Sequence, residues 1–68
     1  MEKNDFAGIR RWFGLSLIQM GAKIGAHFTV VSMIEHGHRD PTEAQAKKLV
    51  SLRARMLREM REKLNAAE

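Results

Sequence analysis

The feature that most constrains this chain of 68 residues is a pair of short helical patterns on either side of Gly25. The first pattern covers residues 16–24 and the second covers residues 27–36. Apolar positions recur at helical spacing in both, at Met20, Gly21 and Ile24 in the first and at Val30, Val31 and Ile34 in the second. Glycine readily adopts the left-handed conformation that closes a helix, so we expect a sharp turn at Gly25.

Two helices joined at a steep angle by a turn of about three to four residues form a helix-turn-helix unit, which can place its second helix in the major groove of DNA. The net charge of +4 and the pI near 10.1 favour a polyanionic partner. Residues 44–58 carry five basic side chains and no acidic one. Arg39, Lys47 and Lys48 are close enough to the unit to contact phosphates, whereas the later basic residues could equally form a solvated helix face.

The length fits one small domain, residues 1–68, with a single core. The chain has no cysteine, which excludes disulfides and cysteine-based metal sites. His36 and His38 could bind a metal in principle, but their spacing and the lack of carboxylate partners favour a surface or phosphate-facing position. The sequence shows no paired carboxylates, activated nucleophile or phosphate-binding glycine loop, so we expect no metal, no cofactor and no enzymatic activity.

A membrane span has to be considered because residues 12–34 carry a single charge, Lys23. A lysine near the centre of a helix costs about 2.5 to 3.5 kcal/mol on insertion scales, and several glycine and polar residues interrupt the apolar run. Residues 1–5 lack the basic and apolar segments of a secretory signal. The sequence therefore predicts a cytoplasmic protein with no membrane association, and no small-molecule ligand is evident.

Residues typical of helix ends flank the central unit. Asn4 or Asp5 can cap a first helix that Gly14 ends. The inner stripe of this helix is Phe6, Ile9 and Phe13, with Trp12 beside it. The later boundaries are Ser16 as the cap of the second helix, Gly37 at the end of the third, and Pro41 with Thr42 at the start of the fourth.

The last segment, from Thr42 to about Asn65, contains no glycine or proline and is rich in strong helix formers. A broad apolar face in its first half suits burial, and consists of Ala46, Leu49, Val50 and Leu52. A narrower stripe in its second half suits a helix partner, and consists of Met56, Leu57, Met60 and Leu64. Residues 53–68 are therefore predicted to be a dimerisation extension, with an exposed tail as the alternative. Whether the helix is continuous or breaks near Arg53 is open at this point.

A set of residues at characteristic spacing is similar to a known family. They are Arg10, Gly14-Leu15-Ser16, Met20-Gly21, Ile24-Gly25, Val31-Ser32, Ile34-Glu35, Gly37, Arg39 and Pro41. Over about residues 6–52 the chain thus resembles the XRE-like helix-turn-helix family of phage Cro and repressor proteins. The resemblance implies an all-α, lambda-repressor-like bundle of five helices, or of four with a long terminal helix. It also implies binding of operator DNA as a homodimer, no enzymatic chemistry, and a structural ion pair between Arg10 and Glu35.

The resemblance places the third helix in the major groove. Its base-facing residues are then His27 at the helix start, Phe28, Thr29, Ser32 and Met33. Hydrogen-bonding side chains are more usual in the family at three positions where this chain has Leu17, Phe28 and Met33. Apolar side chains could contact thymine methyl groups. Alternatively, Phe28 folds back beside Leu17 and fewer side chains read bases.

Phosphate contacts are expected from the amides that open the second helix and from side chains around the unit. The residues concerned are Ser16, Leu17, Lys23, His36, His38, Arg39 and Lys47. The leading hypothesis is a homodimeric transcriptional repressor that binds an inverted repeat with half-sites about 34 Å apart. Short members of the family suggest an autoregulator of a phage or mobile-element operon, such as an anti-CRISPR-associated regulator. The alternative is a protein-interaction module, such as an anti-repressor or antitoxin, that uses the apolar surface of Leu17, Phe28 and Met33.

Overall fold

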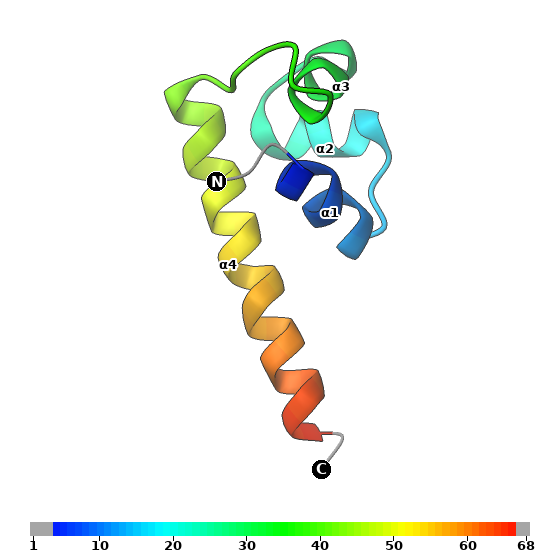
Figure 1. The fold of residues 1–68 in the computed structure, drawn as a ribbon, viewed down its shortest axis with the longest axis vertical. Coiled ribbons are helices and arrows are strands. Elements are labelled where there is room, and N and C mark those ends of the chain that lie inside the picture. Colours follow the sequence, from blue (N-terminus) through cyan, green and yellow to red (C-terminus); the bar gives the residue numbers. More distant parts are fainter. Residues whose placement is uncertain (1–3, 67–68) are drawn as a thin grey trace.

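The computed structural model describes residues 4–66, and this part of the chain is built from helices alone (Figure 1). The helices are α1 (Asn4–Trp12), α2 (Leu17–Ile24), α3 (Phe28–Glu35) and α4 (Glu43–Ala66). The all-α prediction is confirmed, in the form that has a long terminal helix. The predicted cap of α1 at Asn4 or Asp5 involves side chains that lie outside the described part of the structure.

A small core joins the first three helices to the beginning of α4. Its buried side chains are Phe6, Ile9, Met20, Ile24, Val31, Ile34 and Leu49. Phe13, Val30 and Leu52, which were also predicted to face inward, are partly buried against it. The helical periodicity of the sequence therefore predicts the inner faces of α1, α2 and α3 correctly. Residues 6–52, which surround this core, are called the head below.

The connection between α2 and α3 is a tight turn in which the two helices are bent by 96°. Gly25 ends α2 with φ +73°, in the left-handed region that was expected for it. The Ala26 amide donates a 2.8 Å hydrogen bond to the Gly21 carbonyl, which draws the turn back onto α2. A Cβ at Gly21 would overlap the carbonyl oxygen of Ala26. The turn therefore packs so closely on α2 that position 21 has no room for a side chain.

Two reciprocal capping boxes fix where α2 and α4 begin. The Gln19 amide donates to Ser16 Oγ at 3.1 Å, and the Ser16 amide donates to Gln19 Oε1 at 2.9 Å. Thr42 and Gln45 repeat the arrangement with distances of 3.2 and 3.0 Å. The cap expected at Ser16 is therefore present. Helix α4 was expected to start with Pro41 and Thr42, but it starts at Glu43, so Thr42 is its cap and Pro41 precedes the helix.

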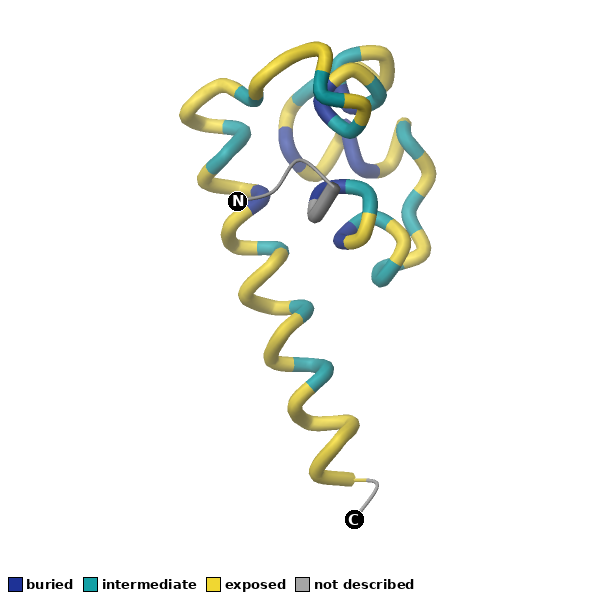
Figure 2. The backbone as a smooth tube through the Cα atoms, in the orientation of Figure 1, coloured by how far each residue is buried: buried dark blue, intermediate teal, exposed yellow. Residues whose placement is uncertain are grey.

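The terminal helix continues without a break from the head to Ala66, which gives the molecule extents of 40 × 20 × 18 Å. Residues 53–66 are called the stem below. Leu49 is 1% exposed, but its neighbour Val50 is 56% exposed, so the prediction that Val50 belongs to the buried face is wrong. Successive helix residues are about 100° apart, and the head covers too narrow a sector of α4 to reach both. Figure 2 shows the stem as mostly exposed, with short intermediate segments at intervals.

Within residues 4–66, no single helix is long and apolar enough to cross a membrane. Helices α2 and α3 taken together pass the same test of length and composition, but the 96° bend separates them.

Candidate nucleic-acid interface

One face of α3 is turned away from the core. Phe28 and Met33 are 42% and 40% exposed, and Thr29 is exposed beside them. On the opposite face, Val31 and Ile34 are 3% and 2% exposed. The buried face anchors α3 to the head, so the exposed face is free to meet a large partner. Of the predicted base-facing residues, His27 also lies in the open, whereas Ser32 is half-buried.

His27 caps α3 and fixes the hydrogen-bonding character of Thr29. The Thr29 amide lies 3.3 Å from His27 Nδ1, and Thr29 Oγ1 lies 2.9 Å from the same atom. Because an amide only donates, Nδ1 is the unprotonated acceptor and the Thr29 hydroxyl donates to it as well. The hydroxyl oxygen keeps its lone pairs, so Thr29 presents an acceptor to a partner.

Phe28 stays exposed, so the alternative in which it folds back beside Leu17 is not adopted. Its ring lies 4.5 Å from the His27 ring, centroid to centroid, at the N-terminal end of α3. Leu17 packs partly against the core, so its side chain contributes little to an outer surface and only its amide fits the predicted phosphate role. The exposed apolar residue of α2 is Ile18, which is 69% exposed. Ile18 does not belong to the inner stripe of Met20, Gly21 and Ile24, so its exposure could have been predicted from the sequence.

Polar side chains continue the exposed face beyond the end of α3. His36 Nδ1 lies 2.8 Å from the backbone carbonyl oxygen of Ser32. A carbonyl cannot donate, so Nδ1 carries the proton and holds the ring against the helix end. The His38 ring stacks near it at a centroid distance of 6.3 Å, and Arg39 follows in the open. The structure therefore brings three of the predicted phosphate contacts, His36, His38 and Arg39, into one exposed loop.

The N-terminus of α2 retains free backbone donors. The capping box uses the amides of Ser16 and Gln19, whereas the amides of Leu17 and Ile18 have no hydrogen-bond acceptor within residues 4–66. Unpaired amides and the positive end of the helix dipole suit a phosphate oxygen.

The sequence matches a family described as helix-turn-helix over residues 8–52, which is nearly the whole of the head. The chain belongs to the XRE-like helix-turn-helix family. It is therefore a DNA-binding regulator of this type, in which α3 occupies the place of the recognition helix. No curated protein and no solved structure gives a significant match.

An ion pair ties α1 of this helix-turn-helix domain to the end of the recognition helix. Arg10 Nε and Nη2 donate to the two carboxylate oxygens of Glu35 at 2.7 and 3.1 Å. Arg10 Nη1 donates to the Leu15 carbonyl at 3.1 Å, so the same side chain also holds the loop before α2. The hydrogen bonds to Glu35 raise the pKa of Arg10 above its ordinary value. The ion pair implied by the family resemblance is thus formed in the structure.

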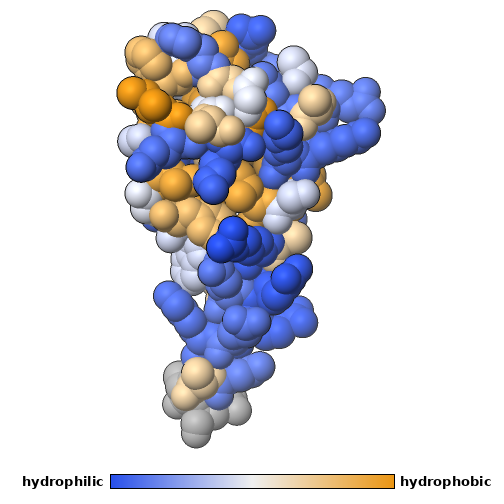
Figure 3. All heavy atoms as spheres, turned by 180° about the vertical axis from the view of Figure 1, so that it is seen from behind, coloured by the Kyte–Doolittle hydropathy of each residue, from blue (hydrophilic) through white to orange (hydrophobic). Residues whose placement is uncertain are grey.

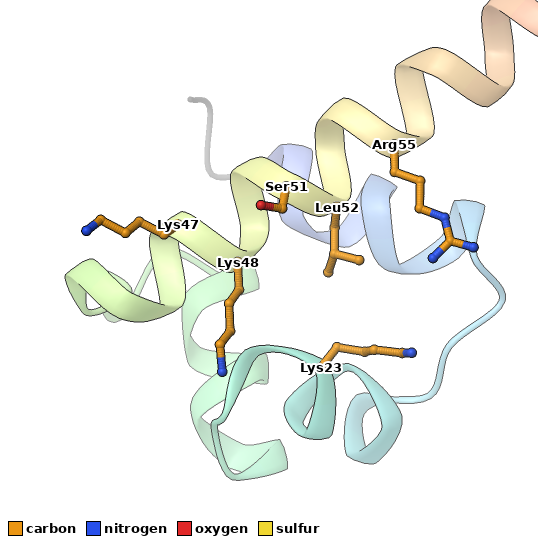
Figure 4. A pocket seen from close by; sticks show the side chains of 6 residues that line it. All are labelled: Lys23, Lys47, Lys48, Ser51, Leu52 and Arg55. Atoms are coloured by element: carbon orange, nitrogen blue, oxygen red, sulfur yellow. The ribbon is translucent and has the colours of Figure 1, made fainter.

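Basic side chains of the domain gather around an open hollow of about 430 Å³ between α2 and α4. Its lining consists of Lys23, Lys47, Lys48, Ser51, Leu52 and Arg55. Figure 4 shows Lys48 extending from α4 toward the end of α2 and Arg55 extending toward the end of α1, whereas Lys47 points away. Lys47 Nζ instead lies 3.7 Å from Glu43 Oε1, and both side chains are exposed. The Arg55 guanidinium lies over Phe13, 5.4 Å from the centroid of its ring.

Arg55 was not among the predicted site residues, because its aromatic partner Phe13 lies far away in the sequence.

Proposed function

We propose that the protein is a homodimeric, sequence-specific repressor that binds an inverted repeat in operator DNA. The observation that carries the proposal is the outer face of α3, on which Phe28, Thr29 and Met33 are exposed while the opposite face is buried. A helix held in this way can enter a major groove without disturbing the core behind it.

Base reading would depend on methyl contacts and on one directed hydrogen bond. Phe28 and Met33 present apolar surface that suits the C5-methyl group of thymine. The Thr29 hydroxyl donates its proton to His27, so Thr29 Oγ1 can accept a hydrogen bond from a base. In the major groove, the amino groups of adenine N6 and cytosine N4 are the donors that fit this acceptor. We infer that Ser32, being half-buried, contributes at the edge of this surface.

Phosphate contacts would fix the register of the helix without reading sequence. We assign them to the free amides after Ser16, at Leu17 and Ile18, and to the loop that carries His36, His38 and Arg39. Lys23 and Lys47 would add charge on the sides of the head.

Repression would follow because a dimer bound at a promoter prevents the transcription machinery from binding the same DNA. We propose that the gene regulated is its own, in a phage or mobile-element operon, and that the protein works in the cytoplasm. A reporter placed behind the DNA upstream of the gene should lose expression as the protein is supplied. Unchanged expression despite occupancy of that DNA would contradict repression.

Selection of binding sites from random DNA with the purified chain tests the main proposal. We expect a palindromic sequence with half-sites about 34 Å apart, and retardation that weakens as salt rises. A selected site without two-fold symmetry would contradict the dimer. Absence of retardation at micromolar protein in low salt would contradict DNA reading by this surface.

The competing candidate is a protein-interaction module such as an anti-repressor or antitoxin. The observation in its favour is the apolar character of the same face, which exposes Phe28 and Met33, while Ile18 on α2 is a further exposed apolar side chain at 69%. Failure of DNA retardation would favour this alternative over the repressor.

A further inference from the structure

The outer face of α3 offers one exposed hydroxyl group. Phe28 and Met33 supply apolar surface and Ser32 is half-buried, so Thr29 is the exposed hydroxyl of this face. On the side of the molecule seen in Figure 3, apolar and hydrophilic side chains are mixed over the head, whereas the stem is mostly hydrophilic. Because the outer face of α3 has so few polar groups, the direction of the hydrogen bond made by Thr29 has a large effect on which bases it fits.

One ring nitrogen of His27 sets that direction. The Thr29 amide and the Thr29 hydroxyl oxygen lie 3.3 and 2.9 Å from His27 Nδ1. In the neutral ring Nδ1 accepts both hydrogen bonds, so the hydroxyl proton points at the ring and the oxygen lone pairs point away from it. Thr29 is then an acceptor, which fits the amino groups of adenine N6 and cytosine N4 in the major groove.

A proton on His27 Nδ1 reverses this arrangement. Both nitrogens of a charged imidazole ring donate, so Nδ1 then donates to Thr29 Oγ1 and the hydroxyl proton turns away from the ring. Thr29 becomes a donor to the base, and guanine O6 and N7 and thymine O4 are acceptors that fit it. The Thr29 amide loses its acceptor, but both residues are exposed, so water can take the place of the ring nitrogen.

Phe28 holds the His27 ring in place in both forms. The two ring centroids are 4.5 Å apart. A neutral ring packs against an aromatic side chain at this distance, and a cation within about 6 Å of an aromatic centroid is attracted to it. The charged ring therefore stays beside Thr29, so protonation changes the direction of the hydrogen bond instead of abolishing it.

The other charged groups around this end of α3 keep their charge while histidine titrates. In the described part of the chain, α2 brings Lys23 in its last turn, and α4 brings Lys48, whose Nζ lies beside Gly25. Lysine stays charged between about pH 5.5 and pH 8, the range in which histidine changes its charge. Arg10 of α1 and the ionisable residues within 35–40 are at the opposite end of the helix. His27 is thus the group beside Thr29 that gains a proton in this range.

We propose that the protonation state of His27 determines which bases Thr29 reads. With a neutral ring Thr29 selects a base that presents an amino group, and with a charged ring it selects a base that presents a keto oxygen. His27 is then a positioning residue that acts through Thr29, and the preferred operator changes as the pH falls. The inference rests on the proposed function, because it requires α3 to face the base edges.

Gel retardation at about pH 8 and about pH 5.5 tests the proposal with duplexes that differ at one base pair. The base pair that Thr29 faces is the one at which Thr29→Val, which replaces the hydroxyl by a methyl group, loses the selectivity of the wild type. Thymine and 5-methylcytosine are compared there, because they share the methyl group and differ in presenting a keto oxygen or an amino group. We expect the wild type to prefer 5-methylcytosine about three- to tenfold at the higher pH and to prefer thymine at the lower pH.

Variants of His27 separate the role of its proton from that of its cap. His27→Asn keeps an acceptor oxygen at the cap but gains no proton, so it should prefer 5-methylcytosine at both pH values. His27→Ala removes the acceptor and should show little preference at either pH. A preference of His27→Asn that changes with pH as in the wild type would overturn the proposal.

His38→Gln is the matched control. Protonation of His36 and His38 in the exposed loop adds charge near the phosphates, which strengthens binding to every duplex at the lower pH. The ratio of the two affinities is therefore the quantity to compare. His38→Gln should change the overall pH dependence of binding and leave the reversal of preference intact.

NMR of the free chain tests the contact without DNA. The ring nitrogen shifts of His27 should place its proton on Nε2 when the ring is neutral, because Nδ1 is the acceptor. The Thr29 amide signal should move as the ring titrates, and this movement should be absent in His27→Asn. A neutral His27 that carries its proton on Nδ1 would overturn the proposal.

These measurements separate the inference from the proposed function. Retardation of selected DNA with the same base preference at both pH values removes the role of the His27 proton and leaves DNA reading by α3 intact. Absence of retardation for every duplex removes base reading by α3, and the proposal fails with it.

Discussion

Glu35 is the residue through which α1 and the recognition helix hold each other in place. Its side chain is 7% exposed and receives two hydrogen bonds from Arg10. We predict that Glu35→Gln lowers the free energy of unfolding by about 2 kcal/mol, because it removes the charge that makes both bonds strong. Glu43→Gln is the control, since Glu43 and its partner Lys47 are 88% and 78% exposed, and the change should stay within about 0.5 kcal/mol. Urea denaturation at one protein concentration measures both, and equal losses would contradict the structural role of the pair.

The same pair has a defined pH dependence on its arginine side. Because pairing raises the pKa of Arg10, its contribution to stability is present at pH values below the ordinary arginine pKa and is lost only as the pH rises through the raised value. We therefore expect no loss of stability from deprotonation of Arg10 between about pH 5 and pH 9, since arginine stays charged in this range. The unfolding temperatures of the wild type and of Glu35→Gln, measured across this pH range, test the expectation. A difference between the two unfolding temperatures that becomes smaller toward pH 9 would contradict it.

Residues of the recognition helix should determine which DNA sequence is bound, whereas residues of the following loop should contribute to binding of any DNA. Phe28→Ala or Thr29→Ala should weaken binding to the selected operator by about 1 to 3 kcal/mol and leave binding to unrelated DNA nearly unchanged. Arg39→Ala should weaken binding to the operator and to unrelated DNA by a similar factor, because a phosphate contact does not depend on the base sequence. It should also reduce the salt dependence of the affinity. Titrations of operator and scrambled duplexes at several salt concentrations measure these effects. Uniform losses on both duplexes for all the variants would refute the assigned roles.

At the level of the elements, the junction of α2 and α3 depends on the absence of a side chain at Gly21. A Cβ there would overlap the Ala26 carbonyl, which is backbone and cannot move aside without opening the turn. We predict that Gly21→Val costs about 3 kcal/mol of unfolding free energy, enough to leave a domain of this size largely unfolded. Ala22→Val, at the next and exposed position, should cost only about 0.5 kcal/mol from helix propensity. Circular dichroism with urea unfolding tests the pair, and similar stability of the two variants would show that the turn tolerates a side chain.

Local signals in the sequence suffice for most of the head. Ser16, Gly25 and Thr42 each act on neighbouring backbone, so their roles as caps and turn could be read without knowing the tertiary contacts. The inner faces of α1, α2 and α3 follow from the helical spacing of their buried residues, although Ile18, Phe28 and Met33 also place apolar side chains on the outer surface. In the long helix the spacing is less informative, since its apolar residues divide between two sides along its whole length.

The division of α4 could not be read from spacing alone. Val50 and Leu49 are adjacent and both apolar, and only the width of the head decides that one is buried and the other exposed. Met56 and Leu57 differ in the same way, because Met56 packs partly against the core and Leu57 is 45% exposed. The contacts of Arg10 with Glu35 and of Arg55 with Phe13 both join distant parts of the chain, so neither has a local signal in the sequence. The family resemblance implied the first contact but not the second.

For the whole molecule, the continuity of α4 decides how two heads can be placed on DNA. Helix α4 runs from Glu43 to Ala66 with no glycine or proline, so the head and the stem move together. If the stems of two copies pair along the side that carries Leu57 and Leu64, as the sequence predicts, the distance between the two recognition helices is fixed by a stiff connection. A stiff dimer reads one spacing between half-sites, whereas flexibly joined heads would accept several.

We therefore predict that inserting about five base pairs between the half-sites weakens binding at least about tenfold, because half a turn of DNA moves one half-site to the opposite side of the duplex. Insertion of about ten base pairs restores the facing but adds about 34 Å, so it should remain weak. A variant with four glycines inserted after Arg53 is the matched comparison: the flexible segment should recover binding to the ten-base-pair insertion while losing affinity for the original site. Gel retardation with this set of duplexes measures the effect. Equal affinity of the wild type for all three spacings would mean that the heads bind independently and that the stem does not set their separation.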